Sequence, residues 1–262
     1  MSAHVEIKQL TSIEQLNELV KIEKAVWQMP TIPVHQTFTA MNNGGVILGS
    51  YTSGKMVGFL YSFAGFNKEK PYLCSHMLGI LPPYRKSGLG IEMKKKQAKI
   101  AKKMGYEMIT WTFDPLESKN AYINLHKLGA CGAHYKENHY GDLNDQLNQG
   151  LPTDRIQIEW DLITTTRKRT HVLDPEKLLL VMEEESPVYR THCTDDLQKS
   201  DVWFVEIPND FQSLKREQIE LAKKWRFESR NVFQALFAAG FIAIDFISEQ
   251  SNKSYYVFSM GV

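Results

Sequence analysis

Hydrophobic residues recur at strand or helix spacing along the first 165 residues and predict a series of short elements. The clearest strand covers residues 155–162, where Ile156, Ile158 and Trp160 alternate with polar or charged residues. The clearest helix start is Asp114-Pro115, because Asp caps a helix, Pro suits the first turn and Glu117 completes a capping box. The pattern predicts strands over residues 4–10, 46–51, 56–63, 72–80, 108–113 and 155–162, and helices over 11–27, 37–42, 88–104 and 114–129.

The composition changes after residue 162, where a polar segment (residues 164–170) is followed by a second one at residues 183–187. Beyond them the pattern predicts strands over residues 202–207, 241–247 and 255–260, and one or two helices between 214 and 239. We therefore expect two domains, residues 1–165 and an additional α+β C-terminal region at 166–262. The sequence contains no internal repeat.

Charge and composition exclude several classes of protein. Lys and Arg number 31 against 30 Asp and Glu, a balance that argues against a nucleic-acid partner. The most apolar stretch, residues 235–244, is shorter than the roughly 20 residues of a membrane helix, and the N-terminus carries no secretion signal. The 3 cysteines have no metal-ligand spacing. We expect a soluble, cytoplasmic protein with no membrane partner and no metal.

Six lysines follow one another closely between residues 94 and 103. The predicted helix there has an apolar stripe of Leu89, Met93, Ile100 and Met104, so the lysines are expected to form its solvated face. No aromatic residues are interleaved with them, which further disfavours binding of a single-stranded nucleic acid. They are Lys94, Lys95, Lys96, Lys99, Lys102 and Lys103.

The segment most informative about chemistry is residues 79–92, where a predicted strand runs through a short loop into a long helix. Gly88 and Gly90 allow close approach of a ligand to the backbone, and the first N–H groups of the helix lack internal partners. Arg85 and Lys86 add positive charge, so the loop is a candidate cradle for a pyrophosphate. A Walker A sequence is absent, and Met93 stands where a dinucleotide-binding loop has its third glycine.

This loop resembles motif A of the GNAT superfamily of acyl-CoA-dependent N-acyltransferases. The signature is Arg or Gln, two variable residues, Gly, one variable residue, and Gly or Ala, which Arg85, Gly88 and Gly90 match. The order of predicted elements over residues 4–162 fits the family, as do Ala121, Lys127 and Gly129 of its next motif, where Ala130 replaces a Phe. The resemblance implies an α/β fold with a mixed, mostly antiparallel sheet flanked by helices.

The resemblance also implies an activity, the transfer of an acyl group from acetyl-CoA or another acyl-CoA, such as succinyl-CoA, to a primary amine. A small-molecule acceptor such as an amino acid is expected, and the family pattern allows a homodimer. The coenzyme would lie between the strands at 72–80 and 108–113. Its contacts would be Leu78, Gly79 and Ile80 with the pantetheine arm, Arg85, Lys86, Ser87, Gly88, Leu89 and Gly90 with the pyrophosphate, and Asn120 and Asn124 on the following helix.

Three residues are candidates for proton transfer. His76 precedes Gly79 on the strand that faces the thioester and is the first choice of general base, the alternative being a histidine packed in the sheet. Asp114 lies at the carboxyl end of the next strand and is either a second base or only a helix cap. The family's usual acidic tyrosine falls at Leu125, so Tyr135 or Tyr140 is considered for that role.

Acceptor binding is expected to involve two loops. The loop at residues 141–154 is long and carries Asp142, Asp145 and Asp154, and the proline-bearing loop at 30–36 carries His35.

Two other functions remain open at this stage. A non-catalytic acyl-CoA sensor would explain Leu125 at the tyrosine position, and a nicotinamide-dependent oxidoreductase would use the same glycine loop. Met93 and the meander of strands before the loop count against the oxidoreductase.

Overall fold

The computed structural model describes residues 5–141, 150–164, 171–184, 186–190, 197–248 and 253–261. The chain forms two compact units, one of residues 1–111 with 160–165 and the other of residues 112–159 with 166–262. Strands β5 (Met108–Phe113) and β7 (Arg155–Asp161) therefore have residues in both units.

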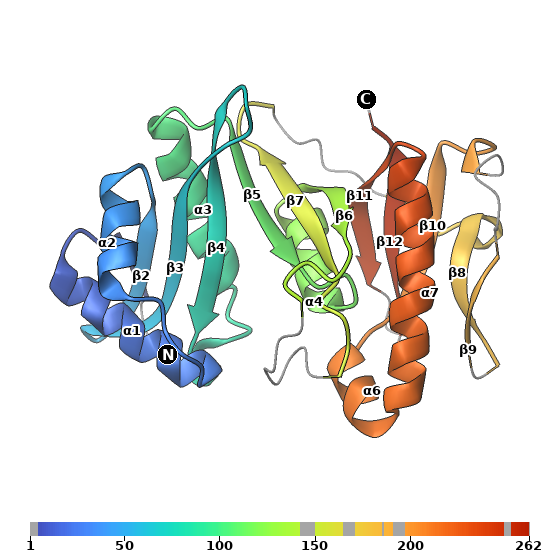
Figure 1. Ribbon diagram of the computed structural model, residues 1–262, viewed down its shortest axis with the longest axis horizontal. Helices are drawn as coiled ribbons and strands as arrows, with labels where there is room; N and C mark the ends of the chain where they lie inside the picture. Colours follow the sequence, from blue (N-terminus) through green and yellow to red (C-terminus); the bar gives the residue numbers. More distant parts are fainter. Residues whose placement is uncertain are drawn as a thin grey trace. The chain divides into compact units, whose positions relative to one another are not determined.

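The first unit is built on a sheet with the strand order β1-β2-β3-β4-β5. Helices α1 and α2 cover one face of this sheet and α3 the other (Figure 1). All pairs from β1 to β4 are antiparallel, and β4 is parallel to β5. The elements are β1 (Glu6–Gln9), α1 (Ile13–Trp27), α2 (Val34–Asn42), β2 (Ile47–Thr52), β3 (Lys55–Phe66), β4 (Pro71–Ile80), the 3₁₀ turn η1 (Pro82–Tyr84) and α3 (Leu89–Lys103).

Helix α1 begins at Ile13, two residues after the predicted start at residue 11, and buries one apolar side. Ser12 and Gln15 form a capping box, and the helix ends at Gln28, which adopts a left-handed conformation. Leu16, Leu19 and Ile22 face the sheet and pack with its aromatic residues in one core cluster.

Helix α3 corrects the expectation that all its lysines are solvated. The side of α3 turned to the sheet carries Lys94 as well as Leu89 and Met93, and Lys94 is only 6% exposed. Its Nζ donates to Ser75 Oγ at 2.8 Å and lies 3.6 Å from the ring centroid of Trp111. Lys94 lies about one helical turn before Gln97 and two before Ala101, which are also buried, so it belongs to the side of α3 that packs on the sheet. Met104, predicted to belong to the apolar stripe, is 46% exposed.

The second unit is built on strands in the order β7-β6-β11-β12-β10-β8-β9. The long helix α7 packs on this sheet (Figure 1), and its Phe233 contacts the rings of Tyr256 and Phe258. The remaining elements are α4 (Ser118–Ala121), the π-helix η2 (Tyr122–Lys127), β6 (Cys131–Lys136), the 3₁₀ turn η3 (Pro175–Lys177), β8 (Leu178–Glu183), β9 (Ser186–Tyr189), β10 (Val202–Pro208), α6 (Phe211–Glu217), α7 (Ile219–Ala238), β11 (Phe241–Ser248) and β12 (Lys253–Met260).

Two predicted features of the second unit differ from the structure. The helix expected over residues 114–129 begins at Ser118 and becomes a π-helix at Tyr122. The Asp114 cap is real but local, because its Oδ1 accepts from the Leu116 N–H at 2.9 Å in the turn before the helix. Strands β8 and β9 were not predicted, since their residues are short runs between polar segments.

A buried group of charged residues holds α7 to the turn after β5 and to β6 and β7. Arg226 is 1% exposed, and its Nη2 lies 2.5 Å from Asp114 Oδ2. Asp154, fully buried, accepts from Arg230 Nε and Nη2 at 2.9 and 2.8 Å and from the Tyr135 hydroxyl at 2.6 Å. Buried ions are tolerated when each is paired in this way.

The predicted fold class is confirmed: the structure is an α/β protein with a mixed, mostly antiparallel sheet arrangement flanked by helices. The compact units divide at residues 111 and 159 as well as at residue 165, so the division into domains 1–165 and 166–262 stays a prediction. Residues 165–170, in the predicted polar segment, lie outside the described part of the chain. None of the described helices is long and apolar enough to cross a membrane.

Replacing Lys94 with Met is expected to change how stability depends on pH. Burial lowers the pKa of Lys94 to about 7, whereas the unfolded chain keeps the ordinary value, so between these values the unfolded state binds more protons and wild-type stability rises with pH. Relative to Lys94→Met, the wild-type free energy of unfolding should rise by about 2–3 kcal/mol between pH 6 and pH 9, measured by urea denaturation. Parallel pH profiles of the two proteins would contradict this.

Replacing Arg226 with Met is expected to destabilise the protein by about 3–5 kcal/mol, because Asp114 loses its nearer guanidinium and is left with Arg155 Nη1 at 3.7 Å. Combining Arg226→Met with Asp114→Asn should recover part of that loss, since the uncompensated charge is then removed as well. Chemical denaturation of the two single variants and the double variant measures this coupling. A cost below about 1 kcal/mol for Arg226→Met would show that the pair is not structural.

Candidate active site

Strand β4 is paired with its parallel neighbour β5 over only part of its length. Hydrogen-bonded pairing with β5 involves Leu73 with Ile109 and Cys74 with Thr110, although β4 continues to Ile80. On its other side β4 pairs with β3 up to Ile80. In the described part of the chain, the β5-facing edge of β4 from Ser75 onward therefore has backbone groups without a strand partner. These include two of the predicted contacts of the pantetheine arm, Leu78 and Ile80. Gly79 instead faces β3, as does Leu81, whose N–H donates to the Val57 carbonyl at 2.9 Å.

His76 lies at an irregularity of the same strand. Tyr61 pairs with Met77 and Ser62 with Ser75, so His76 is an extra residue of β4 that faces no partner on β3. Such bulges turn a side chain away from the regular alternation and occur often beside active sites. The bulge places an exposed His76 next to two aromatic rings, 6.1 Å from Tyr61 and 5.7 Å from Phe63 between ring centroids.

The surroundings of His76 make it neutral at physiological pH. Although part of its surface is exposed, the adjacent rings and strands bury much of the imidazole, and this burial lowers the pKa of His76 below its ordinary value. A neutral imidazole has a free lone pair, which is the form that a general base requires.

The loop between β4 and α3 contains two residues in the left-handed region of backbone conformation. Gly88 has a φ of +83° and forms the N-cap of α3 without a capping side chain, and a Cβ placed on it would meet nothing within 4 Å. Lys86 also adopts a positive φ, of +64°, and this conformation costs a residue other than glycine roughly 1 kcal/mol. Arg85 braces the loop because its Nε donates to the Ile80 carbonyl at 2.8 Å.

The loop can hold an anion. The described residues supply no acceptor for the backbone N–H groups of Leu89 and Gly90 at the start of α3. Together with the positive end of the helix and the charges of Arg85 and Lys86, these donors suit a pyrophosphate. The residues therefore fit a coenzyme A co-substrate, with space for it at Gly88.

The two asparagines predicted to contact the coenzyme belong to the second unit. Asn120 is exposed, whereas Asn124 is 6% exposed and its carbonyl accepts from the Ala130 N–H at 3.1 Å. Their role in coenzyme binding stays a prediction.

Asp114 and Tyr135, the other candidates for proton transfer, both belong to the buried charged group of the second unit. Both carboxylate oxygens of Asp114 are engaged, one by the Leu116 N–H and one by Arg226. Burial and the adjacent Asp154 raise the pKa of Tyr135 far above its ordinary value, so this phenol is a poor proton donor. These contacts fit a structural role for both residues.

Other residues considered for the site also have structural partners. Leu125, at the family's tyrosine position, is 2% exposed. The Tyr140 hydroxyl lies 2.8 Å from Thr112 Oγ1. Residues 142–149 of the predicted acceptor loop, with Asp142 and Asp145, lie outside the described part of the chain.

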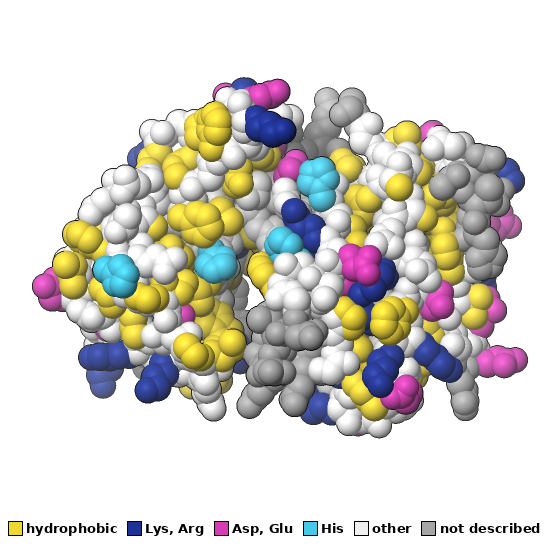
Figure 2. Space-filling view, in the orientation of Figure 1, with side chains coloured by type: hydrophobic (Ala, Val, Ile, Leu, Met, Phe, Trp, Pro, Cys, Tyr) yellow, Lys and Arg dark blue, Asp and Glu magenta, His cyan; other side chains and the backbone are white. Residues whose placement is uncertain are grey.

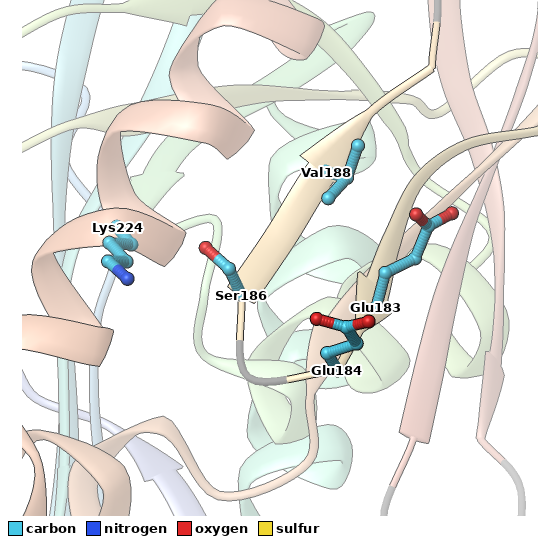
Figure 3. Close-up of a pocket in the computed structure, with 5 residues that line it drawn as sticks. All are labelled: Glu183, Glu184, Ser186, Val188 and Lys224. Carbon is cyan, nitrogen blue, oxygen red and sulfur yellow. The ribbon is translucent and has the colours of Figure 1, made fainter.

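A pocket of about 400 Å³ opens elsewhere, in the second unit (Figure 3). It is polar and contains none of the predicted site residues; its lining comes from the β8–β9 hairpin and α7, namely Glu183, Glu184, Ser186, Val188 and Lys224. Within the described ranges, no group of three or more His, Cys, Asp or Glu side chains is arranged to hold a metal ion.

Comparison with known proteins bears on the first part of the chain. Residues 13–130 match the model of the acetyltransferase (GNAT) family. No curated protein matches the sequence.

A search of solved structures also found acetyltransferases among the proteins similar to this chain. The ribosomal-protein-S18-alanine N-acetyltransferase from Escherichia coli is 14% identical, with a TM-score of 0.51 over 64% of this chain and 100% of its own. Aminoglycoside 6′-acetyltransferase type Ii is 16% identical, with a TM-score of 0.49 over 61% of this chain and 99% of its own. Naa50 from Arabidopsis thaliana, solved with the bisubstrate analogue CoA-Ac-MVNAL, is 15% identical, with a TM-score of 0.47 over 59% of this chain and 97% of its own.

The motif at Arg85–Gly90, the early divergence of β4 from β5 and the family match agree with one another. Residues 13–130, somewhat under half of the chain, therefore resemble an acetyltransferase domain of the GNAT family in sequence and in local structure.

Proposed function

We propose that this protein transfers an acyl group, by default acetyl, from coenzyme A to the primary amine of a small metabolite such as an amino acid. The observation that carries the proposal is the unpaired edge of β4, which runs directly into the glycine loop at the start of α3. An extended arm can hydrogen-bond to such an edge as an added strand would. The pyrophosphate then reaches the backbone donors at Leu89 and Gly90, beside Arg85 and Lys86.

The chemistry assigned to the chain is direct attack of the amine on the thioester. The neutral imidazole of His76 takes a proton from the incoming ammonium, which frees the lone pair that attacks the carbonyl carbon. A backbone N–H near Leu78, on the unpaired edge, donates to the oxyanion that develops on the carbonyl oxygen. The C–S bond then breaks, and the thiolate leaves without an assigned acid because its pKa is only a unit or two above neutral pH. The nitrogen releases its second proton to the thiolate or to water, which gives the neutral amide, and His76 returns its own proton to the solvent.

Replacing Gly88 with Glu is expected to abolish binding of acetyl-CoA. A side chain at a φ of +83° is strained, and this one places a carboxylate beside the site of the pyrophosphate. Isothermal titration calorimetry with acetyl-CoA and CoA measures the loss, which should exceed 100-fold in Kd because repulsion and strain act together.

The matched control is Gly90→Ala, two residues further on. A Cβ at Gly90 would make ordinary contacts of 3.5 Å with Ile80 Cδ1 and Leu78 Cδ2, and alanine stabilises a helix relative to glycine. This variant should fold and bind acetyl-CoA within about threefold of the wild type. If the wild type binds neither acetyl-CoA nor CoA, the proposed function is wrong.

Replacing His76 with Gln is expected to lower kcat/KM for acetyl transfer by about 100-fold or more, because glutamine cannot take up the proton. Since burial lowers the pKa of His76, the wild-type rate should fall only in acid, with a midpoint below pH 6.5. That acid limb should disappear in His76→Gln. Initial rates over pH 5–9 with saturating acetyl-CoA test this.

The affinity for acetyl-CoA should stay within a few-fold in His76→Gln, because the imidazole is not part of the glycine loop. A variant that turns over amines at the wild-type rate would remove His76 from the mechanism. Turnover of no amine by a wild type that binds acetyl-CoA would instead favour the sensor.

A further inference from the structure

The segment that supplies α2 and strands β2, β3 and β4 of the first unit carries almost no charge. Of the 60 residues from 25 to 84, only four are charged, against 23% of the whole chain. They are Lys55, Lys68, Glu69 and Lys70. Lys55 lies at the β2–β3 turn and the other three between β3 and β4, so all four are at hairpin ends.

The space-filling view agrees with this distribution. On the side of the first unit shown in Figure 2, hydrophobic and uncharged side chains predominate over α2, β3 and β4, and charged side chains lie toward the edges. This face therefore exerts little net electrostatic attraction or repulsion on a charged ligand.

Aromatic residues form a row along β3 that ends at His76. Phe59, Tyr61 and Phe63 share one side of the strand because they are two residues apart. Phe59 is fully buried against Trp27 at a centroid distance of 5.6 Å, Tyr61 is 4% exposed and Phe63 is partly exposed. The row therefore begins in the core at Phe59 and ends near the surface at Phe63, which lies beside His76 on the β4 bulge.

We infer that the amine acceptor has an aromatic or aliphatic body, which packs on Phe63 and its neighbours while its amine lies at His76, and that this body carries no second charge. The inference rests on the proposed function and narrows its acceptor. An ammonium buried on this face would find no carboxylate on residues 25–68, and burying an unpaired charge is costly. The buried carboxylate of Glu23 on α1 lies against this segment, where its Oε1 accepts from the Ile32 N–H at 3.1 Å. An apolar body gains free energy with each methylene that it removes from water.

Two series of amines test the inference with acetyl-CoA held at saturation. From propylamine to hexylamine, kcat/KM should rise by up to about fourfold for each methylene, because each buries more apolar surface. Hexamethylenediamine, which differs from hexylamine mainly by a terminal ammonium, should be at least tenfold worse.

Variants of Phe63 connect the preference to this face. Phe63→Ala should lower kcat/KM for hexylamine about tenfold, and by much less for ethylamine, which has little body to pack. Phe63→Leu keeps an apolar surface and should restore most of the loss. Circular dichroism and acetyl-CoA affinity show whether the variants are folded.

The outcomes separate the inference from the function on which it rests. Acetyl transfer to hexamethylenediamine at least as fast as to hexylamine, or an equal loss for both amines in Phe63→Ala, overturns the inference and leaves the acyltransferase standing. Absence of acetyl transfer to every amine, polar or apolar, overturns the proposed function itself.

Discussion

The parting of β4 from β5 is the constraint on which the candidate site depends. Two parallel strands normally satisfy each other's backbone groups along their common length. Here the pairing covers Leu73 and Cys74 of β4 and stops, while β3 continues to hold the other edge as far as Ile80. The strand therefore stays rigid while one edge keeps free donors and acceptors. Backbone groups in that state must be satisfied by water or a ligand, and the glycine loop that follows binds the far end of the same ligand in our proposal.

The second unit shows why residues with the right chemistry need not be catalytic. Asp114 lies where open α/β sheets place ligands, which is why its position indicates a base. In the folded chain its carboxylate instead neutralises Arg226, and Tyr135 donates to the buried Asp154. Asp114 is 112 residues away in sequence from its partner Arg226, and Asp154 is 76 residues away from its partner Arg230. Such pairs are created by tertiary packing, so spacing along the chain contains no signal for them.

The sequence predicts local features well and their relative placement poorly. The strands of the first unit and the extents of α1 and α3, to within a few residues, follow from short patterns that the chain satisfies by itself. The bulge at His76 depends on the register between β3 and β4. The alternation of hydrophobic residues along each strand does not show that the pairing of the two strands shifts by one residue there. Burial of Lys94 was missed for a related reason, because a run of lysines indicates a solvated face unless the position of the opposite sheet is known. The π-helix at Tyr122–Lys127 likewise has no signature in composition.

Two consecutive residues of β4, Ser75 and His76, lie beside or carry a basic group whose charge is disfavoured by burial. Ser75 contacts Lys94 of α3, and His76, on the bulge, contacts the aromatic row of β3. Both basic groups lose proton affinity because burial disfavours their charged forms. A low charge density across residues 25–84 strengthens this effect at His76, since no nearby carboxylate offsets the desolvation. The apolar character of this face thus does two things at once: it favours an apolar acceptor, and it keeps the imidazole in the neutral form that can accept the acceptor's proton.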